Sequence, residues 1–173
     1  KLQASGLLDE FSSFVFFSLG SGVGGATALD HKLVYGAKGF AGELGHFALP
    51  GVSLRCKCGK VGCLDTLAGG TSIASRHGAS WWALQGSSLR TQALHDAGAA
   101  CGLAAATLIQ ILNPSLFVFC GHLAKEVDFM SAIHSQLRAE VWDDLPEVKS
   151  CWDAWSLALR GARHVLNRRG DDA

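Results

Sequence analysis

Three closely spaced cysteines constrain the fold of this chain more than any other feature of its sequence. Cys56 and Cys58 flank a single lysine, and Cys63 follows after two glycines that let the backbone wrap around a small ion. Together with His46 they offer one imidazole and three thiols, the donor set of a tetrahedral zinc site. Unrelated thiols or a surface disulfide remain as alternatives, but the clustering favours a metal in a reducing compartment. The sequence therefore predicts a small zinc-binding insert over residues 46–63.

The composition is that of a folded protein without a strong charge bias. Among 173 residues, 49% are hydrophobic, and 15 Lys and Arg balance 15 Asp and Glu. This excludes a disordered chain and argues against a nucleic-acid surface spread over the whole chain. Residues 1–10 lack the pattern of a targeting segment, and the apolar run 99–120 is broken at Asn113-Pro114. We therefore expect a cytoplasmic protein with no membrane span.

Apolar and turn residues predict three strands, then the cysteine-bearing segment, then alternating helices and strands. The expected strands are 11–19, 23–29, 32–35, 116–120 and 148–151. The expected helices are 64–76, split at Gly69-Gly70 with Thr71 as the second N-cap, followed by 88–112, 123–141 and 155–167. This order predicts an α/β fold, a mixed sheet with packed helices.

Two further groups of residues are expected to have structural roles. Apolar surroundings predict small core side chains at Cys101, Cys120 and Cys151. The tryptophan pair Trp81-Trp82 is expected in the core or at an interface.

Three motifs follow one another between residues 19 and 70. They are Leu-Gly-Ser-Gly-Val-Gly-Gly from Leu19, Gly-Phe-Ala-Gly-Glu-Leu-Gly-His from Gly39 and Cys-Lys-Cys-Gly-Lys-Val-Gly-Cys-Leu-Asp from Cys56. Together they resemble the ROK family of bacterial sugar-responsive repressors and sugar kinases, and weaker similarity continues through residues 97–125. The resemblance implies an actin-like ATPase (ribonuclease H-like) fold, in which two lobes surround a sugar cleft. The predicted order of elements fits the second, C-terminal lobe.

The resemblance also implies that residues 1–173 form a single incomplete ROK domain, the second lobe. The first lobe, with the aspartate that deprotonates the sugar hydroxyl, would precede Lys1. The DNA-binding helix-turn-helix of the repressor branch would lie further upstream. We therefore expect no catalytic residue in this chain, no phosphoryl transfer by it alone, and DNA contacts only through such an N-terminal domain.

The resemblance places sugar contacts at Glu43, His46 and Asp65. An ionised carboxylate accepts hydrogen bonds from sugar hydroxyls, which suits Glu43. His46 can give one ring nitrogen to zinc and present its other N–H to the sugar, because metal binding fixes the tautomer. Asp65 is one methylene shorter than the glutamate that the family usually has there.

A glycine-rich turn and a later glycine are the expected nucleotide contacts. In the family pattern, backbone N–H groups of such a turn approach phosphate oxygens, although the turn alone is a common hairpin. The residues concerned are Gly20, Ser21, Gly22, Gly24 and Gly121. Cys120 replaces a glycine of the family and His122 adds bulk, and both changes argue against close approach of a nucleotide.

Three functions remain open at this point. The first is the sugar-binding effector lobe of a ROK transcriptional regulator, favoured by the altered nucleotide motif, by Asp65 and by a repressor-like segment at 157–166. The alternative is the C-terminal half of a ROK sugar kinase, glucokinase-like, which transfers phosphate from Mg-ATP to a hexose or amino sugar. The third is a zinc-stabilised module that only binds a partner. The expected partners are a sugar or sugar phosphate and further copies of the chain, because the lost lobe would leave an apolar face uncovered.

Overall fold

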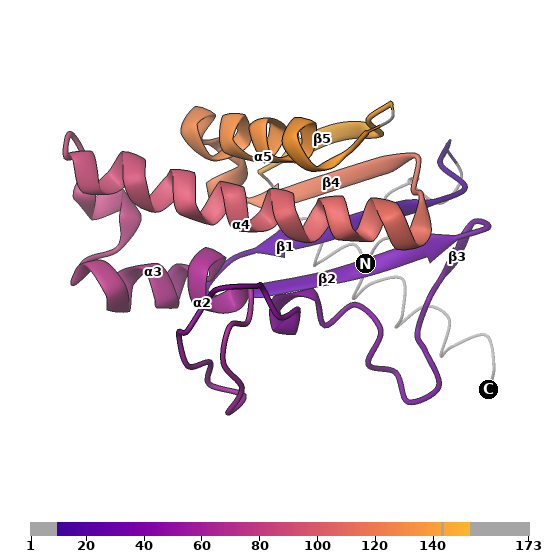
Figure 1. The fold of residues 1–173 in the computed structure, drawn as a ribbon, viewed down its shortest axis with the longest axis horizontal. Helices are drawn as coiled ribbons and strands as arrows, with labels where there is room; N and C mark the ends of the chain where they lie inside the picture. Colours follow the sequence, from indigo (N-terminus) through magenta and orange to yellow (C-terminus); the bar gives the residue numbers. More distant parts are fainter. Residues whose placement is uncertain (1–9, 143, 153–173) are drawn as a thin grey trace, which may run out of the picture.

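The computed structural model describes residues 10–142 and 144–152, which form one mixed five-stranded sheet covered by helices (Figure 1). The strands lie in the order β3-β2-β1-β4-β5. Their bounds are Phe14–Leu19 (β1), Val23–Leu29 (β2), Lys32–Leu33 (β3), Leu116–Gly121 (β4) and Glu147–Cys151 (β5). Tight turns make β1, β2 and β3 antiparallel, whereas β1, β4 and β5 are parallel because helices connect them.

Two long helices cover one face of the sheet (Figure 1). The α-helices are Asp65–Ala68 (α2), Gly70–His77 (α3), Ser88–Leu112 (α4) and Val127–Glu140 (α5). Single 3-10 turns lie at Leu44–His46 (η2), Trp81–Leu84 (η3) and His122–Lys125 (η4). The longest helix, α4, ends at Asn113, which adopts a left-handed conformation directly before Pro114.

Glycines let α4 and α5 pack closely. A Cβ atom at Gly98 would lie 2.3 Å from the carbonyl oxygen of Phe129, and one at Gly102 would lie 2.7 Å from Cβ of Gln136. α4 is also the helix of the described residues with the length and mean hydropathy to cross a bilayer. Half of that stretch is buried in the fold, as is typical of a core helix.

The sheet carries an apolar core on each face. Phe17, Phe117 and Phe119 stack between the sheet and the two long helices. Leu116 and Val118 belong to a second cluster on the opposite face, because successive strand residues point to opposite sides. β4 is buried on both faces, which explains its uninterrupted apolar sequence.

Most elements agree with the sequence prediction, and the differences have local causes. The second strand and the helix over 88–112 have the predicted bounds. The first strand begins at Phe14 rather than at residue 11, and the third ends at Leu33 rather than at residue 35. The helix expected over 123–141 divides at Glu126 into η4 and α5. The predicted helix 155–167 and the segment 157–166 lie outside the described residues.

The prediction that Thr71 caps the second short helix is wrong. α3 already begins at Gly70, and Gly69 occupies the cap position. The hydroxyl of Thr71 instead donates a hydrogen bond to the carbonyl oxygen of Ser21, at 2.8 Å. Thr71 therefore ties α3 to the turn between β1 and β2.

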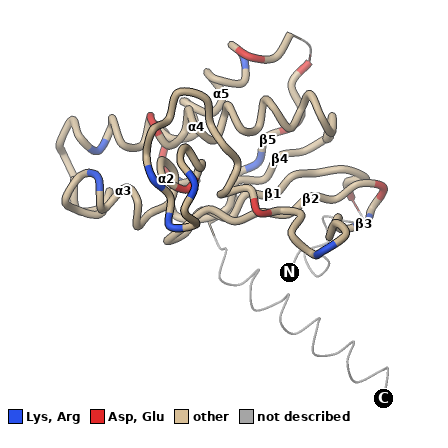
Figure 2. Tube along the Cα trace, turned by 60° about the horizontal axis from the view of Figure 1, so that its bottom comes forward, with Lys and Arg blue, Asp and Glu red and all other residues tan. Residues whose placement is uncertain are grey.

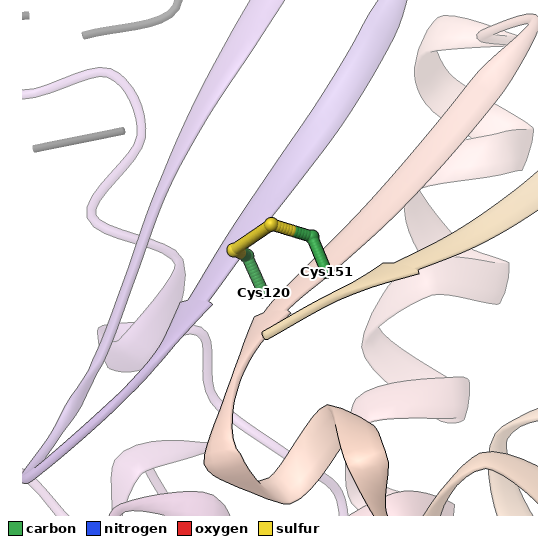
Figure 3. Close-up of a disulfide and its surroundings, with 2 residues drawn as sticks. All are labelled: Cys120 and Cys151. Atoms are coloured by element: carbon green, nitrogen blue, oxygen red, sulfur yellow. A yellow bond between two sulfur atoms is a disulfide. The ribbon is translucent and has the colours of Figure 1, made fainter. Parts of the chain in front are cut away.

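The prediction for two of the remaining cysteines also needs correction. Cys120 is fully buried as predicted, but Cys151 is only half-buried, and the two form a disulfide between β4 and β5 that the sequence analysis did not predict (Figure 3). The sequence could not show this, because the two cysteines become neighbours only through the parallel register that pairs them. Cys101 is a free, fully buried thiol as predicted, and this burial raises its pKa.

Candidate functional site

The cysteine-bearing loop folds back on itself before it enters α2. The backbone N–H of Cys56 donates to the carbonyl of Lys60 at 2.8 Å, and the N–H of Gly59 donates to the carbonyl of Cys56 at 3.0 Å. This tight turn uses a positive φ of 89° at Gly59, a conformation that glycine adopts readily. An isolated bridge between Ala48 and Cys63 closes the base of the loop. The turn thereby brings cysteines from both of its arms together.

The four predicted metal ligands meet in one cluster. One ligand atom from each of His46, Cys56, Cys58 and Cys63 lies within 4.8 Å of all the others. Nδ1 of His46 is 3.8 Å from Sγ of Cys56, and the sulfur atoms of Cys58 and Cys63 are 3.6 Å apart. Zn–S bonds of about 2.3 Å in a tetrahedron place sulfurs about 3.8 Å from one another. The residues therefore fit a zinc ion bound by three cysteines and one histidine.

Two thiols of the cluster have pKa values shifted in opposite directions. Burial of Cys63 raises the pKa of its thiol to about 12, and hydrogen bonds with Cys58 and Cys56 add to this effect. The backbone hydrogen bond with Lys60 lowers the pKa of Cys58. A divalent ion would remove the thiol protons, because thiolates are the binding form. The loop beside α2 also carries basic residues, which offset excess thiolate charge (Figure 2).

Glu43 directly precedes the short turn η2 and His46 ends it, and this turn is pressed against β2. A Cβ atom at Gly45 would lie 2.1 Å from the carbonyl oxygen of Val23, so this segment has no room to move toward the strand. The Nδ1 side of His46 faces the sulfur cluster, which leaves Nε2 for another partner. Among the described residues, the exposed carboxylate of Glu43 has no hydrogen-bond or ion-pair partner. Both side chains are therefore available to a ligand.

Asp65 connects the beginning of α2 to the hairpin between β1 and β2. Its Oδ1 accepts a hydrogen bond from the backbone N–H of Val23 at 2.7 Å. A Cβ atom at either Gly22 or Gly69 would lie 2.8 Å from the same oxygen, so both glycines make room for the carboxylate. Asp65 thus holds the hairpin in place, and its predicted sugar contact stays a prediction.

Replacing Asp65 with alanine is expected to reduce stability more than replacing it with asparagine. The alanine variant leaves the N–H of Val23 without its partner, at a cost of about 2 kcal/mol. Asparagine keeps an acceptor oxygen at the same distance from the backbone, so Asp65→Asn should lose less than half of the stability that Asp65→Ala loses. Urea unfolding of the two variants checks this, and equal losses would contradict the role assigned to Oδ1.

The turn between β1 and β2 borders a cavity of about 480 Å³. The N–H of Gly70 donates to the carbonyl of Gly20, and the N–H of Thr71 donates to that of Ser21, which fixes the turn against α3. The cavity walls consist mainly of apolar and small residues. They are Leu19, Gly20, Ser21, Gly70, Thr71, Ala74, Ser80, Trp81, Trp82, His122 and Leu123.

The structure places the five predicted phosphate and nucleotide residues differently around this cavity. Gly20 and Ser21 line it, whereas Gly22 belongs to the same turn next to Asp65. Gly24 lies within β2 opposite Ser18 and does not line the cavity. Gly121 does not line it either, but it allows β4 to end directly against Leu19.

Sequence reasoning missed the tryptophan pair as part of this cavity. The two rings meet edge to face at 5.7 Å between centroids. Trp81 is 7% exposed and Trp82 is 57% exposed, so one ring builds the wall and the other its rim. The doublet itself was the available signal, but only the position of η3 beside the hairpin assigns it to the cavity.

The chain is similar to sugar kinases and to repressors. The sequence model of the ROK family matches residues 4–162. A glucokinase of Halalkalibacterium halodurans is 40% identical over 67 residues, which are 38% of this chain and 20% of that protein. A xylose repressor of Caldicellulosiruptor bescii is 29% identical over 131 residues, which are 62% of this chain and 33% of the repressor. The chain therefore spans a third or less of the length of these relatives.

Solved structures confirm the actin-like ATPase fold of the family. A ROK hexokinase from Thermus thermophilus has a TM-score of 0.79 at 23% identity, over 92% of this chain and 60% of the hexokinase. A ROK family transcriptional regulator, a homolog of the E. coli MLC protein, has a TM-score of 0.72 at 24% identity, over 85% of this chain and 45% of the regulator. The family match over most of the sequence shows that the chain belongs to the ROK family.

Proposed function

We propose that this chain is the sugar-binding effector lobe of a cytoplasmic ROK transcriptional regulator. The observation that carries the proposal is the position of Glu43 and His46 on one rigid turn beside the sulfur cluster. The carboxylate of Glu43, which has no partner within residues 10–142 and 144–152, and the imidazole of His46 form a pair that accepts from and donates to neighbouring hydroxyls of a carbohydrate. Asp65 would complete the contact set with its second oxygen.

The cluster gives the proposed site its rigidity. Zinc bound by Nδ1 of His46 would supply a fixed tautomer and ring orientation, so that Nε2 carries the proton and donates it to a sugar hydroxyl. Glu43 is only three residues away, at the N-cap of η2, and the close packing of Gly45 on Val23 keeps the spacing constant. A sugar is therefore bound at low entropic cost on the protein side.

Two observations favour a regulator over an enzyme. The similarity to the xylose repressor extends over 62% of the chain, compared with 38% for the glucokinase. Asp65 is shorter than the family's usual glutamate and is already engaged with the hairpin. In this proposal residues 1–173 are the second lobe of the sugar-binding domain, and DNA is bound by a separate N-terminal domain. Sugar binding would change the lobe geometry and with it DNA affinity in a homo-oligomer.

The second candidate is the C-terminal half of a ROK sugar kinase, and the cavity favours it. A space of about 480 Å³ with aromatic walls lies next to a turn whose backbone N–H groups suit phosphate oxygens. A glucokinase from Streptomyces griseus with a TM-score of 0.75 was solved with glucose and AMPPNP. In this alternative the cavity would hold the base of Mg-ATP and the turn its phosphates.

Glu43→Gln is expected to weaken sugar binding at least about 10-fold, because the variant loses a charged acceptor for hydroxyl hydrogens. Calorimetric titration of the zinc-loaded protein with hexoses, pentoses and amino sugars measures the affinities. Glu140→Gln serves as the matched control, since this exposed residue ends α5 and hydrogen-bonds only Gln136 among the described residues. Unchanged affinity in Glu43→Gln would contradict the proposed site. ATP-dependent sugar phosphorylation by the full-length protein would decide for the kinase.

A further inference from the structure

We propose that Cys120 and Cys151 form a reversible redox modification site that fastens and releases the edge strand β5. This site is separate from the metal cluster and goes beyond the sugar-binding function proposed above. The two residues face each other in the register of the parallel strands β4 and β5, with Cα atoms 4.3 Å apart, and are joined as a disulfide (Figure 3).

Among the described cysteines, Cys120 and Cys151 can form a disulfide only with each other. Cys151 packs against the cluster that contains Leu116 and Val118, on the sheet face opposite α4 and α5. Cys101 belongs to the core on the helix-covered face, and the other three described cysteines belong to the metal cluster. Cys120 can therefore close a disulfide only with Cys151 within the described part of the chain.

The difference in exposure sets the order of the chemistry. Cys120 is fully buried, whereas Cys151 is half-buried at the end of an edge strand. A peroxide therefore reaches Cys151 first. Its thiolate attacks one peroxide oxygen, the O–O bond breaks, and hydrogen peroxide leaves one water and a sulfenic acid. Cys120 then attacks that sulfur, the S–O bond breaks, and a second water leaves as the S–S bond forms.

A dithiol reductant reverses the reaction. One of its thiolates attacks Sγ of Cys151, because that sulfur is the more accessible, and Cys120 leaves as a thiolate and takes up a proton. The second thiol of the reductant then releases Cys151, so that the reductant ends as a disulfide and the protein as a dithiol. The two electrons and two protons are thereby balanced in both directions.

The state of the pair affects how firmly β5 is held. Within the described sheet β5 pairs with one neighbour, β4, and the disulfide is its covalent link to that strand. The contact of Lys125 Nζ with the ring of Trp152, at 4.4 Å, is a weaker link at the same end. Cys120 directly precedes Gly121, and the next two residues, His122 and Leu123, line the cavity. Opening the disulfide therefore loosens β5 from β4, the strand that leads into the cavity.

The test uses the zinc-loaded chain in three states: reduced with dithiothreitol, reoxidised with one equivalent of hydrogen peroxide, and reduced again. Peptide mapping should find residues 91–125 linked to residues 150–160 only in the oxidised state. Hydrogen exchange of the amides in 147–151 should be at least about 10-fold faster in both reduced states. The variant Cys101→Ala should behave in the same way, which assigns the link to Cys120 rather than to the other cysteine of that peptide.

Three outcomes would overturn the proposal. The first is a folded protein in which peroxide leaves the pair as thiols. The second is a disulfide that dithiothreitol opens only when the protein unfolds, which makes the link permanent. The third is a change in exchange at 147–151 that also occurs in Cys151→Ala, in which no disulfide can form. None of these measurements uses a sugar or a nucleotide. Their results therefore test the redox proposal independently of the proposed function.

Discussion

Cys63→Ser is expected to leave the protein almost without zinc and to lower its stability by at least about 3 kcal/mol. Cys63 is fully buried, and its sulfur is 3.6 Å from that of Cys58. Serine offers a poor zinc ligand, and the remaining ligands would then hold the ion weakly or not at all. Binding free energy at a structural site adds directly to the stability of the folded state, so its loss lowers the free energy of unfolding.

Elemental analysis and thermal unfolding measure this effect. The parent protein should carry one zinc per chain, whereas Cys63→Ser should carry less than about one tenth of that and melt about 6–12 °C lower. Cys101→Ala is the matched control, because Cys101 is another fully buried free cysteine but lies outside the cluster. Its zinc content should stay at one. Loss of zinc in both variants, or in neither, would contradict the assignment of the ligands.

Gly121→Ala is expected to cost about 4 kcal/mol or more. Gly121 has φ of 139° and ψ of −179°, a region that only glycine occupies readily. A Cβ atom there would lie 1.9 Å from the carbonyl oxygen of Leu19 and 2.8 Å from its carbonyl carbon. The end of β1 would have to move, and Leu19 also lines the cavity.

Chemical denaturation of Gly121→Ala and Gly78→Ala compares a crowded glycine with an uncrowded one. Gly78 also has a positive φ, of 70°, but a Cβ atom there would meet nothing within 4 Å. Its replacement should cost only about 1 kcal/mol, the strain of the left-handed backbone alone. Similar losses in the two variants would show that β4 does not end against Leu19 as described.

Local sequence patterns were sufficient wherever neighbours along the chain decide the structure. The glycine turn at 20–22 predicts the β1–β2 hairpin, and Asn113-Pro114 predicts the end of α4, because both act through their own backbone. The grouping of His46 with the three nearby cysteines was also predictable, since three of these four side chains come from a single loop. The wrong N-cap at Thr71 arose because its hydroxyl bonds the carbonyl of Ser21, a residue 50 positions away.

Features that depend on distant pairing were not accessible from the sequence. The Cys120–Cys151 disulfide requires the register of the parallel strands β4 and β5. A helix connects these strands, and the sequence of such a connection does not determine their register. The tryptophan doublet becomes a cavity wall only because η3 lies beside the hairpin and His122. Asp65 was assigned to a sugar from its motif, but its contact with the N–H of Val23 arises only in the folded chain.

X-ray absorption at the zinc edge of the purified protein tests the central claim most directly. One imidazole from His46 and the sulfurs of Cys56, Cys58 and Cys63 should give a first shell of three sulfurs at about 2.3 Å and one nitrogen at about 2.0 Å. A shell made only of nitrogen and oxygen, or a sample whose three sulfurs are oxidised and hold no metal, would contradict a zinc-organised sugar site.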